Sequence, residues 1–521
     1  MTGVSGSPPN IIVIMVDDAG YADFGFQGSD DVLTPNLDAF ANEGVRFSHA
    51  YATVPQCAPS RAAFITGQYA QRFGVETNFG VGHGADQGSP LDGQTTIAES
   101  LSDVGYRTAL IGKWHIGKNA ASHPLEHGFD EFFGFLGGAN EYFPSTSGIH
   151  PQVLRNRVVA NDDRYLTSAF AEESIAFIAR NSGQSFFLFV SFNAPHGPMA
   201  APSYLKDLYS YLSDDPQRQL YGAVMTGMDI AVGRILEHLK TTDLDENTLV
   251  FFVNDNGGDP RKNSASNEPF RGRKTSLLEG GIRVPFLFRW PAAFDGGQEV
   301  NFPVSLLDVA ATIQAACASD FQSELDGIDL VPFLDGRVQA APERKLFWRF
   351  RWPPDVDSQQ QIAIREDDWK WVKPRFEEPS LYNIVDDPAE SINRIEEQQS
   401  LSDDLFSSFV EWERNFLVEP LFYRPPFGSP FVPDQSISGI TFSDDLLILE
   451  VETEKEHLYR VMSSNDLTEW DFTGISFYGD RSRSEIRMDP ARVGRFFRLE
   501  YRMYNNEMVA NPSWVEIRRL Y

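Results

Sequence analysis

Residues 11–18 read Ile-Ile-Val-Ile-Met-Val-Asp-Asp, six apolar residues followed at once by two aspartates. An unbroken apolar run of this length is typical of a strand that is covered on both faces, as in a parallel sheet with helices on each side. The two aspartates come at the carboxyl end of the strand, the edge at which open α/β sheets bind their ligands. This stretch therefore predicts both the kind of sheet and the place of a site.

Three further apolar runs end in the same way. Residues 108–111 lead into Gly112-Lys113-Trp114-His115, residues 186–192 into Asn193-Ala194-Pro195-His196, and residues 249–253 into Asp255-Asn256-Gly257-Gly258 after Asn254. Helical segments lie between the runs, such as 34–44 and 96–105, which have the polar start and the glycine end of a helix. We therefore predict an α/β domain over residues 1–344, in which helices flank a large, mostly parallel sheet and the four polar segments meet at one edge.

The pattern changes after residue 344. Four short strands, at 346–350, 361–365, 369–373 and 381–384, and a helix at 403–416 predict a small antiparallel sheet subdomain over 345–424. The proline-rich stretch 425–434 predicts a linker, and period-two alternation over 435–521 predicts an accessory, sandwich-like β domain. Trp470 or Tyr478 of this domain could bind carbohydrate, although packing in its core is the simpler interpretation.

The charge and the hydropathy of the sequence argue against two classes of protein, those that bind nucleic acid or anionic membranes and those that span a membrane. The 521 residues carry 44 Lys and Arg against 74 Asp and Glu, a net charge of −30. Such a charge argues against nucleic acid or an anionic membrane as a partner, and an anionic substrate would need a local cluster of cations. The sequence contains no apolar run long enough for a membrane span. The first residues lack the features of a secretory leader, so the protein is cytoplasmic, or periplasmic or secreted if a leader was removed.

Only two cysteines are present, which excludes a disulfide framework. Cys317 lies in an apolar helical pattern and is expected to be a small buried hydrophobe. Cys57 begins the string Cys57-Ala58-Pro59-Ser60-Arg61, and Gly67 ends the apolar segment behind it. Pro59 suits the first position of a helix and Gly67 its exit, so Cys57 is expected at a helix N-terminus, where an anion is stabilised. Arg61, one turn later, can face the same place.

This string resembles the maturation signal of the type I sulfatases, a family of the alkaline phosphatase superfamily. The resemblance continues in the family's order up to about residue 415. Its further blocks are Asp17-Asp18, Gly112-Lys113-Trp114-His115, Pro195-His196, Asp255-Asn256-Gly257-Gly258, Gly272-Arg273-Lys274 and Glu279-Gly280-Gly281-Ile282-Arg283-Val284-Pro285. The resemblance implies an alkaline-phosphatase-like fold and a sulfuric ester hydrolase. Singly, several of these blocks would be read as turns or solvated charges, and it is their combination that is specific.

The resemblance also implies the chemistry. A separate maturation enzyme would oxidise Cys57 to formylglycine, whose hydrate supplies the nucleophile. Asp17, Asp18, Asp255 and Asn256 form a hard oxygen set suited to Ca²⁺ or Mg²⁺, and the family implies one Ca²⁺ ion. By resemblance, His115 assists the hydrate, while His196 and Lys274 serve the leaving oxygen. The implied catalytic residues are Cys57, Arg61, Lys113, His115, His196 and Lys274.

The substrate predicted from these features is a sulfated carbohydrate. A phosphonate monoester or phosphodiester hydrolase of the same superfamily is the nearest alternative, and an inactive glycan-binding protein on the same scaffold is the second. A two-metal zinc phosphatase is disfavoured, because it needs more histidine and carboxylate ligands. The loops at 137–150 and 254–267 are expected to shape the pocket, but their sequences indicate neither the sugar nor the sulfate position, and the oligomeric state stays open.

Overall fold

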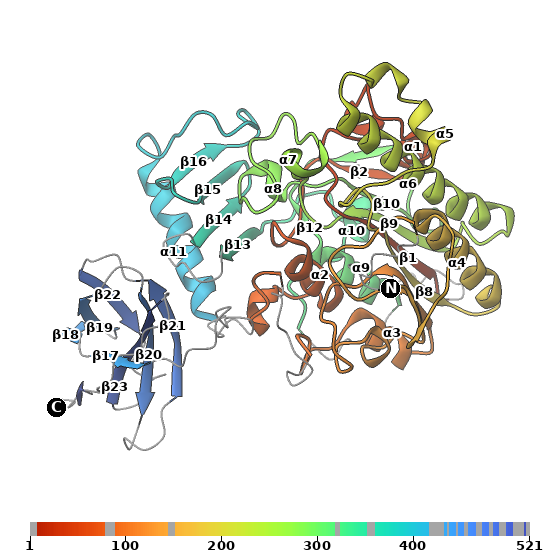
Figure 1. Ribbon diagram of the computed structural model, residues 1–521. Helices are drawn as coiled ribbons and strands as arrows, with labels where there is room; N and C mark the ends of the chain where they lie inside the picture. The colour runs from red at the N-terminus through yellow and green to blue at the C-terminus, as the bar shows by residue number, and fades with distance from the viewer. Residues whose placement is uncertain are drawn as a thin grey trace. The chain divides into compact units, whose positions relative to one another are not determined.

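The computed structural model describes residues 8–78, 89–143, 152–317, 324–351 and 360–415, and beyond them the backbone of the strands between residues 432 and 516. The chain divides into two compact units (Figure 1). The first unit comprises residues 1–350 and 361–413, and the second comprises residues 351–360 and 414–521. The predicted domain boundaries at 344, 424 and 434 stay predictions.

A ten-stranded sheet forms the centre of the first unit, in the order β11-β2-β10-β9-β1-β8-β4-β5-β6-β7. Its middle is parallel, because β9, β1, β8, β4 and β5 pair in parallel with one another, while the outer strands add antiparallel pairs on both sides. The predicted large, mostly parallel sheet is confirmed. The strands are β1 (Asn10–Val16), β2 (Val45–Phe47), β4 (Arg107–Lys113), β5 (Glu131–Phe135), β6 (Leu154–Arg155), β7 (Val158–Val159), β8 (Phe186–Ser191), β9 (Thr248–Asn254), β10 (Phe286–Arg289) and β11 (Gln298–Val300).

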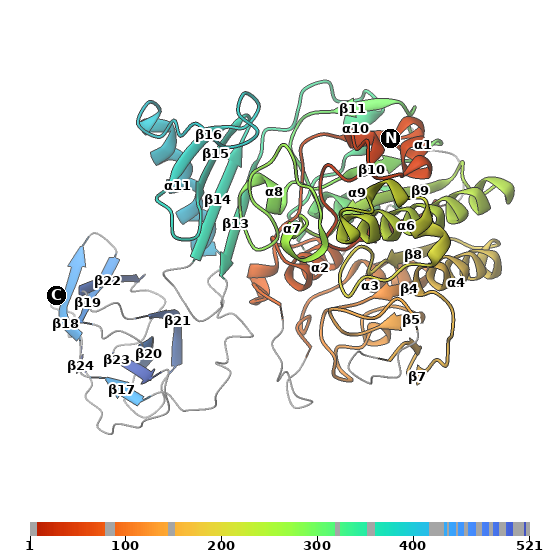
Figure 2. The same ribbon diagram turned by 45° about the horizontal axis from the view of Figure 1, so that its top comes forward.

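Helices cover both faces of this sheet, which is why β1, β8 and β9 carry long apolar runs. On one face Ile12, Ile14 and Val16 join a buried cluster with α1 (Pro35–Glu43), α4 (Leu166–Asn181) and α6 (Pro216–Thr241). Figure 2 shows α4 and α6 side by side. On the other face Phe64 of α2 (Cys57–Thr66) packs on Phe189 of β8, and α3 (Ile97–Asp103) and α9 (Leu307–Cys317) lie near α2 and β4. None of the helices in the described ranges is long and apolar enough to cross a membrane.

The predicted helix ends are confirmed where their capping residues are described. Thr34 precedes α1 and Gly44 follows it. Thr96 caps α3 through a capping box, because its hydroxyl accepts from the Glu99 N–H while the Glu99 carboxylate accepts from the Thr96 N–H. Local sequence thus decides where these helices begin.

The register of the sheet brings the carboxyl ends of four strands to one place. Val16 at the end of β1 pairs with Asn254 at the end of β9, and Met15 pairs with Ser191 at the end of β8. Ser191 also pairs with Gly112 near the end of β4. The polar segments that follow β1, β4, β8 and β9 therefore share one edge, as the sequence predicted.

A four-stranded antiparallel sheet with one helix belongs to the same unit. Its elements are β13 (Lys345–Arg351), β14 (Gln360–Glu366), β15 (Trp369–Lys373), β16 (Ser380–Asn383) and α11 (Gln399–Asn415), so the predicted strands are confirmed and the helix starts four residues earlier than predicted. Gln361 holds the segment behind Lys274, because its amide donates to Thr275 O at 2.9 Å and accepts from Leu277 N at 3.1 Å. The small sheet thereby supports part of the site edge.

The remaining described elements are short. In the first unit they are β3 (Ala50–Tyr51), β12 (Val304–Ser305), α5 (Ser203–Asp207), α7 (Pro260–Asn263), α8 (Glu279–Ile282) and α10 (Val331–Leu334), with 3-10 turns at Gly25–Gln27, Ala70–Phe73, Pro124–Glu126 and Ser210–Leu212.

Between residues 432 and 516 the described elements of the second unit are all strands. One antiparallel sheet holds β17 (Val432–Asp434), β20 (His457–Ser464), β21 (Asp471–Tyr478), β23 (Phe496–Met503) and β24 (Val515–Glu516), and another holds β18 (Ile437–Ser443), β19 (Leu446–Glu452) and β22 (Arg483–Met488). Trp470 and residues 425–431 of the predicted linker lie outside the described residues, and of Tyr478 only the backbone is described. The carbohydrate-binding interpretation of this unit therefore stays a prediction.

Candidate active site

The predicted site residues lie together at the carboxyl edge of the parallel strands. Asp17 and Asp18 follow β1, Asp255 and Asn256 follow β9, and Lys113 ends β4. All five are buried. Buried charges are tolerated only where they pair with one another or bind an ion, so this edge of the sheet is the candidate active site.

Cys57 is the first residue of α2, as predicted, although Pro59 is the third residue of the helix instead of the first. The helix ends at Gly67, whose positive φ of 67° suits glycine. The ammonium of Lys274 donates to Cys57 Sγ at 2.9 Å, and Sγ lies 3.9 Å from Asp18 Oδ1. Burial nevertheless raises the pKa of the Cys57 thiol to about 12. A thiol with a raised pKa is a weaker nucleophile at neutral pH, because less of it is present as thiolate.

Arg61 and Lys113 neutralise the carboxylates on the β1 and β9 side of the site. Arg61 Nε donates to Asp255 Oδ2 at 2.9 Å, and Lys113 Nζ donates to Asp17 Oδ2 at 2.5 Å. Arg61 Nη1 also donates to Ser191 Oγ at 2.6 Å, and that hydroxyl donates to the Lys113 carbonyl at 2.7 Å. These contacts hold both cations against the carboxylates that follow β1 and β9.

The oxygen atoms of the site fit a divalent cation. Asp17, Asp18, Asp255 and Cys57 each offer a ligand atom, all within 4.8 Å of one another. Asp17 Oδ1 and Asn256 Oδ1 are buried and accept no hydrogen bond from the residues that the structure describes. Burial, and next the charge of Asp17, raise the pKa of Asp255 to about 6, because both destabilise its carboxylate form. A bound cation would stabilise that form. Hard carboxylate and amide oxygens are the ligands that Ca²⁺ and Mg²⁺ prefer.

The charges of this cluster show what it can bind. Asp17, Asp18 and Asp255 supply three negative charges, and the three cations Arg61, Lys113 and Lys274 balance them. Burial alone would raise the pKa of Asp18, but Lys274, His196 and Lys113 hold it well below its usual value. With a divalent cation added, the site would be positive by two charges. Such a site suits a small anion, in a chain whose net charge is −30.

Two histidines border the cluster. His196 Nδ1 lies 2.6 Å from Gly197 O, which places the ring proton on Nδ1 and leaves Nε2 facing Asp18 Oδ2 at 3.6 Å. Burial lowers the pKa of His196 to about 3. Its side chain is 23% exposed, so of the two histidines His196 lies nearer the solvent. Burial, then Lys113 and Arg61, lower the pKa of His115 well below its usual value. Both shifts favour the neutral form of the ring.

Three site segments hold a non-glycine residue in the left-handed region. Asp18 has φ 64°, His115 φ 61° and Thr275 φ 72°. Each such residue costs about 1–3 kcal/mol and persists only where surrounding contacts fix it. The Asp18 N–H donates to Asp255 Oδ1 at 3.3 Å, and the Thr275 N–H donates to Pro55 O at 2.8 Å. The backbone is thus held where it aims the Asp18 carboxylate and the Lys274 ammonium at Cys57.

Three contributing residues were missed by the sequence reasoning. Ser191 links Arg61 to Lys113, and a hydroxyl in an otherwise apolar buried strand was the signal that could have found it. Asn263 donates to Asp18 O at 3.0 Å. Gly138 lies against His115, since a Cβ there would come within 2.5 Å of Nε2. Gly138 and Asn263 belong to the two loops expected to shape the pocket, of which residues 144–150 lie outside the described part.

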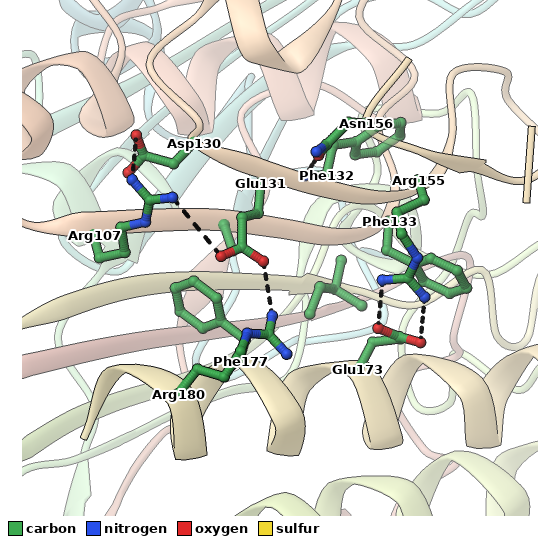
Figure 3. A pocket seen from close by; sticks show the side chains of 12 residues that line it. Arg107, Asp130, Glu131, Phe132, Phe133, Arg155, Asn156, Glu173, Phe177 and Arg180 are labelled. Carbon is green, nitrogen blue, oxygen red and sulfur yellow. Dashed lines mark hydrogen bonds and ion pairs between the residues drawn. The ribbon is translucent and has the colours of Figure 1, made fainter. Parts of the chain in front are cut away.

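A cavity of about 280 Å³ lies elsewhere on the sheet, between β4, β5 and α4 (Figure 3). Its arginines are all paired with its carboxylates. Arg107 lies 3.1 Å from Asp130, Arg180 lies 2.8 Å from Glu131, and Arg155 lies 2.6 Å from Glu173. Because these charges already cancel, and because Arg107 begins β4 whereas Lys113 ends it, this cavity is not part of the anion site.

Comparison with known proteins identifies the family of the chain. Residues 9–317 match the family described as "Sulfatase", and residues 273–412 match "N-sulphoglucosamine sulphohydrolase, C-terminal". The chain is 34% identical to the N-acetylgalactosamine-6-sulfatase of Sus scrofa in an alignment 370 residues long, which covers 65% of this chain and 69% of that protein.

Solved structures give a similar result. The crystal structure of Ps i-CgsB in complex with k-i-k-neocarrahexaose has a TM-score of 0.75 and 32% identity, covering 81% of this chain and 96% of that one. The phosphonate monoester hydrolase of Agrobacterium radiobacter has a TM-score of 0.55 and 19% identity, covering 78% of this chain and 96% of that one. At that identity the second likeness concerns the fold alone.

Proposed function

Because the chain belongs to the sulfatase family and is a sulfuric ester hydrolase, we propose that it removes sulfate from a sulfated carbohydrate, using formylglycine made from Cys57 and a bound Ca²⁺ ion. Sulfatases in general use formylglycine and a divalent metal. The observation that carries the proposal is the position of Cys57, buried at the start of α2 with Lys274 at 2.9 Å and Asp18 at 3.9 Å. Burial raises the pKa of its thiol and so weakens the unmodified thiol as a nucleophile, which supports a role for the oxidised form.

Four residues would hold the metal ion: Asp17, Asp18, Asp255 and Asn256. When bound, the ion supplies Lewis-acid stabilisation of sulfate oxygens and of the nucleophile. Arg61, Lys113 and Lys274 would offset the remaining negative charge as the S–O bond breaks. All three are held by ion pairs to the same carboxylates, so they need little reorganisation during the reaction.

The two histidines and Lys274 are the groups that could move protons. His196 Nε2 and the Lys274 ammonium both lie close to the Asp18 carboxylate, and we assign them to the leaving oxygen. His115 is buried beside Lys113 and Arg61, and we assign it to the hydrated formylglycine. Conversion of Cys57 requires a separate maturation enzyme in the producing cell.

A carbohydrate substrate is supported by the relatives. N-acetylgalactosamine-6-sulfatase is named for an amino sugar, and Ps i-CgsB was crystallised with a neocarrahexaose. The phosphonate monoester hydrolase shares only the fold. An inactive glycan-binding protein is disfavoured because buried cations and carboxylates contact one another beside Cys57, an arrangement that binding of a glycan alone would not need.

The proposal is tested by paired substrates. Protein in which Cys57 has been converted is expected to release free sulfate from sulfated oligosaccharides and from 4-nitrophenyl sulfate. It is expected to act at least 100-fold more slowly, as kcat/KM, on the matching phosphate diester and phosphonate monoester. Faster turnover of the phosphorus esters would instead identify a phosphonate or phosphodiester hydrolase, and binding of glycan without any turnover would identify the inactive alternative.

Removal of the metal is expected to stop the reaction. Dialysis against a chelator should abolish sulfate release, and Ca²⁺ should restore it, because the ion would supply Lewis-acid stabilisation of the sulfate oxygens that the three cations alone do not give. Ca²⁺ should also stabilise the folded chain, by about 2.7 kcal/mol at a concentration 100 times its Kd. Thermal unfolding with and without Ca²⁺ measures this apart from activity. The same stabilisation in an Asp17→Asn/Asp255→Asn variant would contradict the assigned ligands.

A further inference from the structure

The segment between Asn256 and Lys274 is strongly basic in an otherwise acidic chain. Residues 259–274 hold five cations and two carboxylates, whereas the whole chain holds 44 cations against 74 carboxylates. Lys274 reaches Cys57, and Arg271 donates to Tyr382 OH at 3.2 Å. Three cations of the segment, Arg261, Lys262 and Arg273, have neither of these tasks; we call them the basic rim.

The basic rim gathers around one carboxylate. Asp259 Oδ1 lies 3.5 Å from Arg261 Nε and 3.7 Å from Arg273 Nε, and Asp259 Oδ2 lies 3.9 Å from Lys262 Nζ. These distances are long for ion pairs, and one carboxylate balances only one of the three charges. Arg273 Nε is buried and donates no hydrogen bond among the described residues. Among the ion pairs of the described residues, Asp259 is the one carboxylate that these three cations share, so two positive charges are in excess there and their donors are available to a further acceptor.

The rim is fixed beside the site by hydrogen bonds to it. The side chain of Asn263, in the same short helix as Arg261 and Lys262, donates to Asp18 O at 3.0 Å. The Lys274 N–H donates to Gly258 O at 3.0 Å, which ties both ends of the segment together. The cationic heads nevertheless reach solvent, since the side chains of Arg261, Lys262 and Arg273 are 64%, 78% and 38% exposed. A ligand in the site would thus have a preformed group of exposed cations next to it.

We propose that the basic rim is a subsite for a second sulfate of the same substrate, so that the enzyme prefers a glycan with at least two sulfate groups to one that carries only the sulfate being removed. This inference rests on the proposed function, because it assumes a sulfated carbohydrate in the site. The chemistry is that of guanidinium and ammonium groups, which bind a sulfate monoester as they bind other oxyanions. Because the basic rim lies at the surface, its contribution to substrate binding should weaken as the salt concentration rises.

Binding to the full chain that carries Cys57→Ala tests the subsite without turnover. The probes are a monosulfated and a disulfated disaccharide of the same sugar sequence. We expect the disulfated probe to bind about tenfold more tightly, by a factor that shrinks as NaCl is raised from about 0.05 to 0.5 M. Adding Arg261→Gln, Lys262→Gln and Arg273→Gln should remove this preference.

A matched control keeps the same change of net charge. Arg155→Gln, Arg180→Gln and Arg234→Gln also remove three cations, each with a side chain at least 44% exposed and none near Cys57. The preference should survive in this control. Three results would overturn the subsite. The preference for the disulfated probe could be lost equally in both triple variants, it could survive in the rim variant, or the starting protein could show no preference. Failure of the proposed function shows separately, as mature wild-type protein that releases no sulfate from either disaccharide.

Discussion

Replacement of Cys57 by alanine is expected to abolish sulfate release, lowering kcat by on the order of 10⁵-fold or more, as loss of a nucleophile does in other hydrolases. Alanine cannot be converted to formylglycine, so the buried position beside Lys274 and Asp18 would hold no hydroxyl able to attack sulfur. The fold should persist, because a small side chain replaces a small side chain at the start of α2. Sulfate release by the purified variant measures the effect, and circular dichroism checks the fold.

The second cysteine supplies the matched control. Cys317 ends α9, is partly buried and lies 3.1 Å from the hydroxyl of Tyr106, far along the chain from every site residue. Cys317→Ala should keep both turnover and the aldehyde at position 57, which the mass of the peptide around Cys57 reports. Activity retained in Cys57→Ala, or lost equally in Cys317→Ala, would contradict the assignment of Cys57 as the precursor of the nucleophile.

Exchange of Lys370 for methionine is expected to lower the free energy of unfolding by about 3–5 kcal/mol, the usual cost of removing one partner from a buried ion pair. Lys370 is fully buried on β15, and its ammonium lies 2.7 Å from Glu279 Oε1 and 2.9 Å from Glu390 Oε1. Burial would raise the pKa of Glu279, but Lys370, Arg283 and Arg365 lower it to about 2. Without Lys370 two buried carboxylates would face each other.

The same exchange at Lys373 is the control. Lys373 ends β15 three residues later and is only partly buried, so Lys373→Met should change the free energy of unfolding by less than about 0.5 kcal/mol. Urea unfolding of the full chain, followed by tryptophan fluorescence, compares the two variants. Equal stability of Lys370→Met and Lys373→Met would show that Lys370 does not hold the small sheet to α8, the helix that carries Glu279.

The network around Lys370 shows one limit of sequence reasoning. Glu279 and Lys370 are visible in the sequence, yet nothing in their surroundings indicates that they meet across 91 positions. Tyr51 joins them from a third segment, donating to Glu279 Oε2 at 2.7 Å. Partners of this kind are chosen when elements pack, so a local pattern cannot show them.

The basic rim shows another limit. Five cations within sixteen residues are visible in the sequence, but not that three of them share Asp259 or that Asn263 ties their helix to Asp18. The same holds for Ser191, which contacts Arg61 across 130 positions. In each case the sequence shows the residue type but not the residue that it contacts in the fold.

The sequence by itself determined the central strands, their polar ends and the helix that begins at Cys57. These features are local, because apolar runs, capping residues and a proline near a helix start act within a few residues of themselves. The tertiary structure decided which ends became neighbours. β8 lies between β1 and β4, although it follows both in the chain, and this order sets Lys113, Ser191 and Asp17 beside Arg61. Strand order and side-chain pairing depend on the packing of the whole sheet with its helices, which no short stretch of sequence specifies.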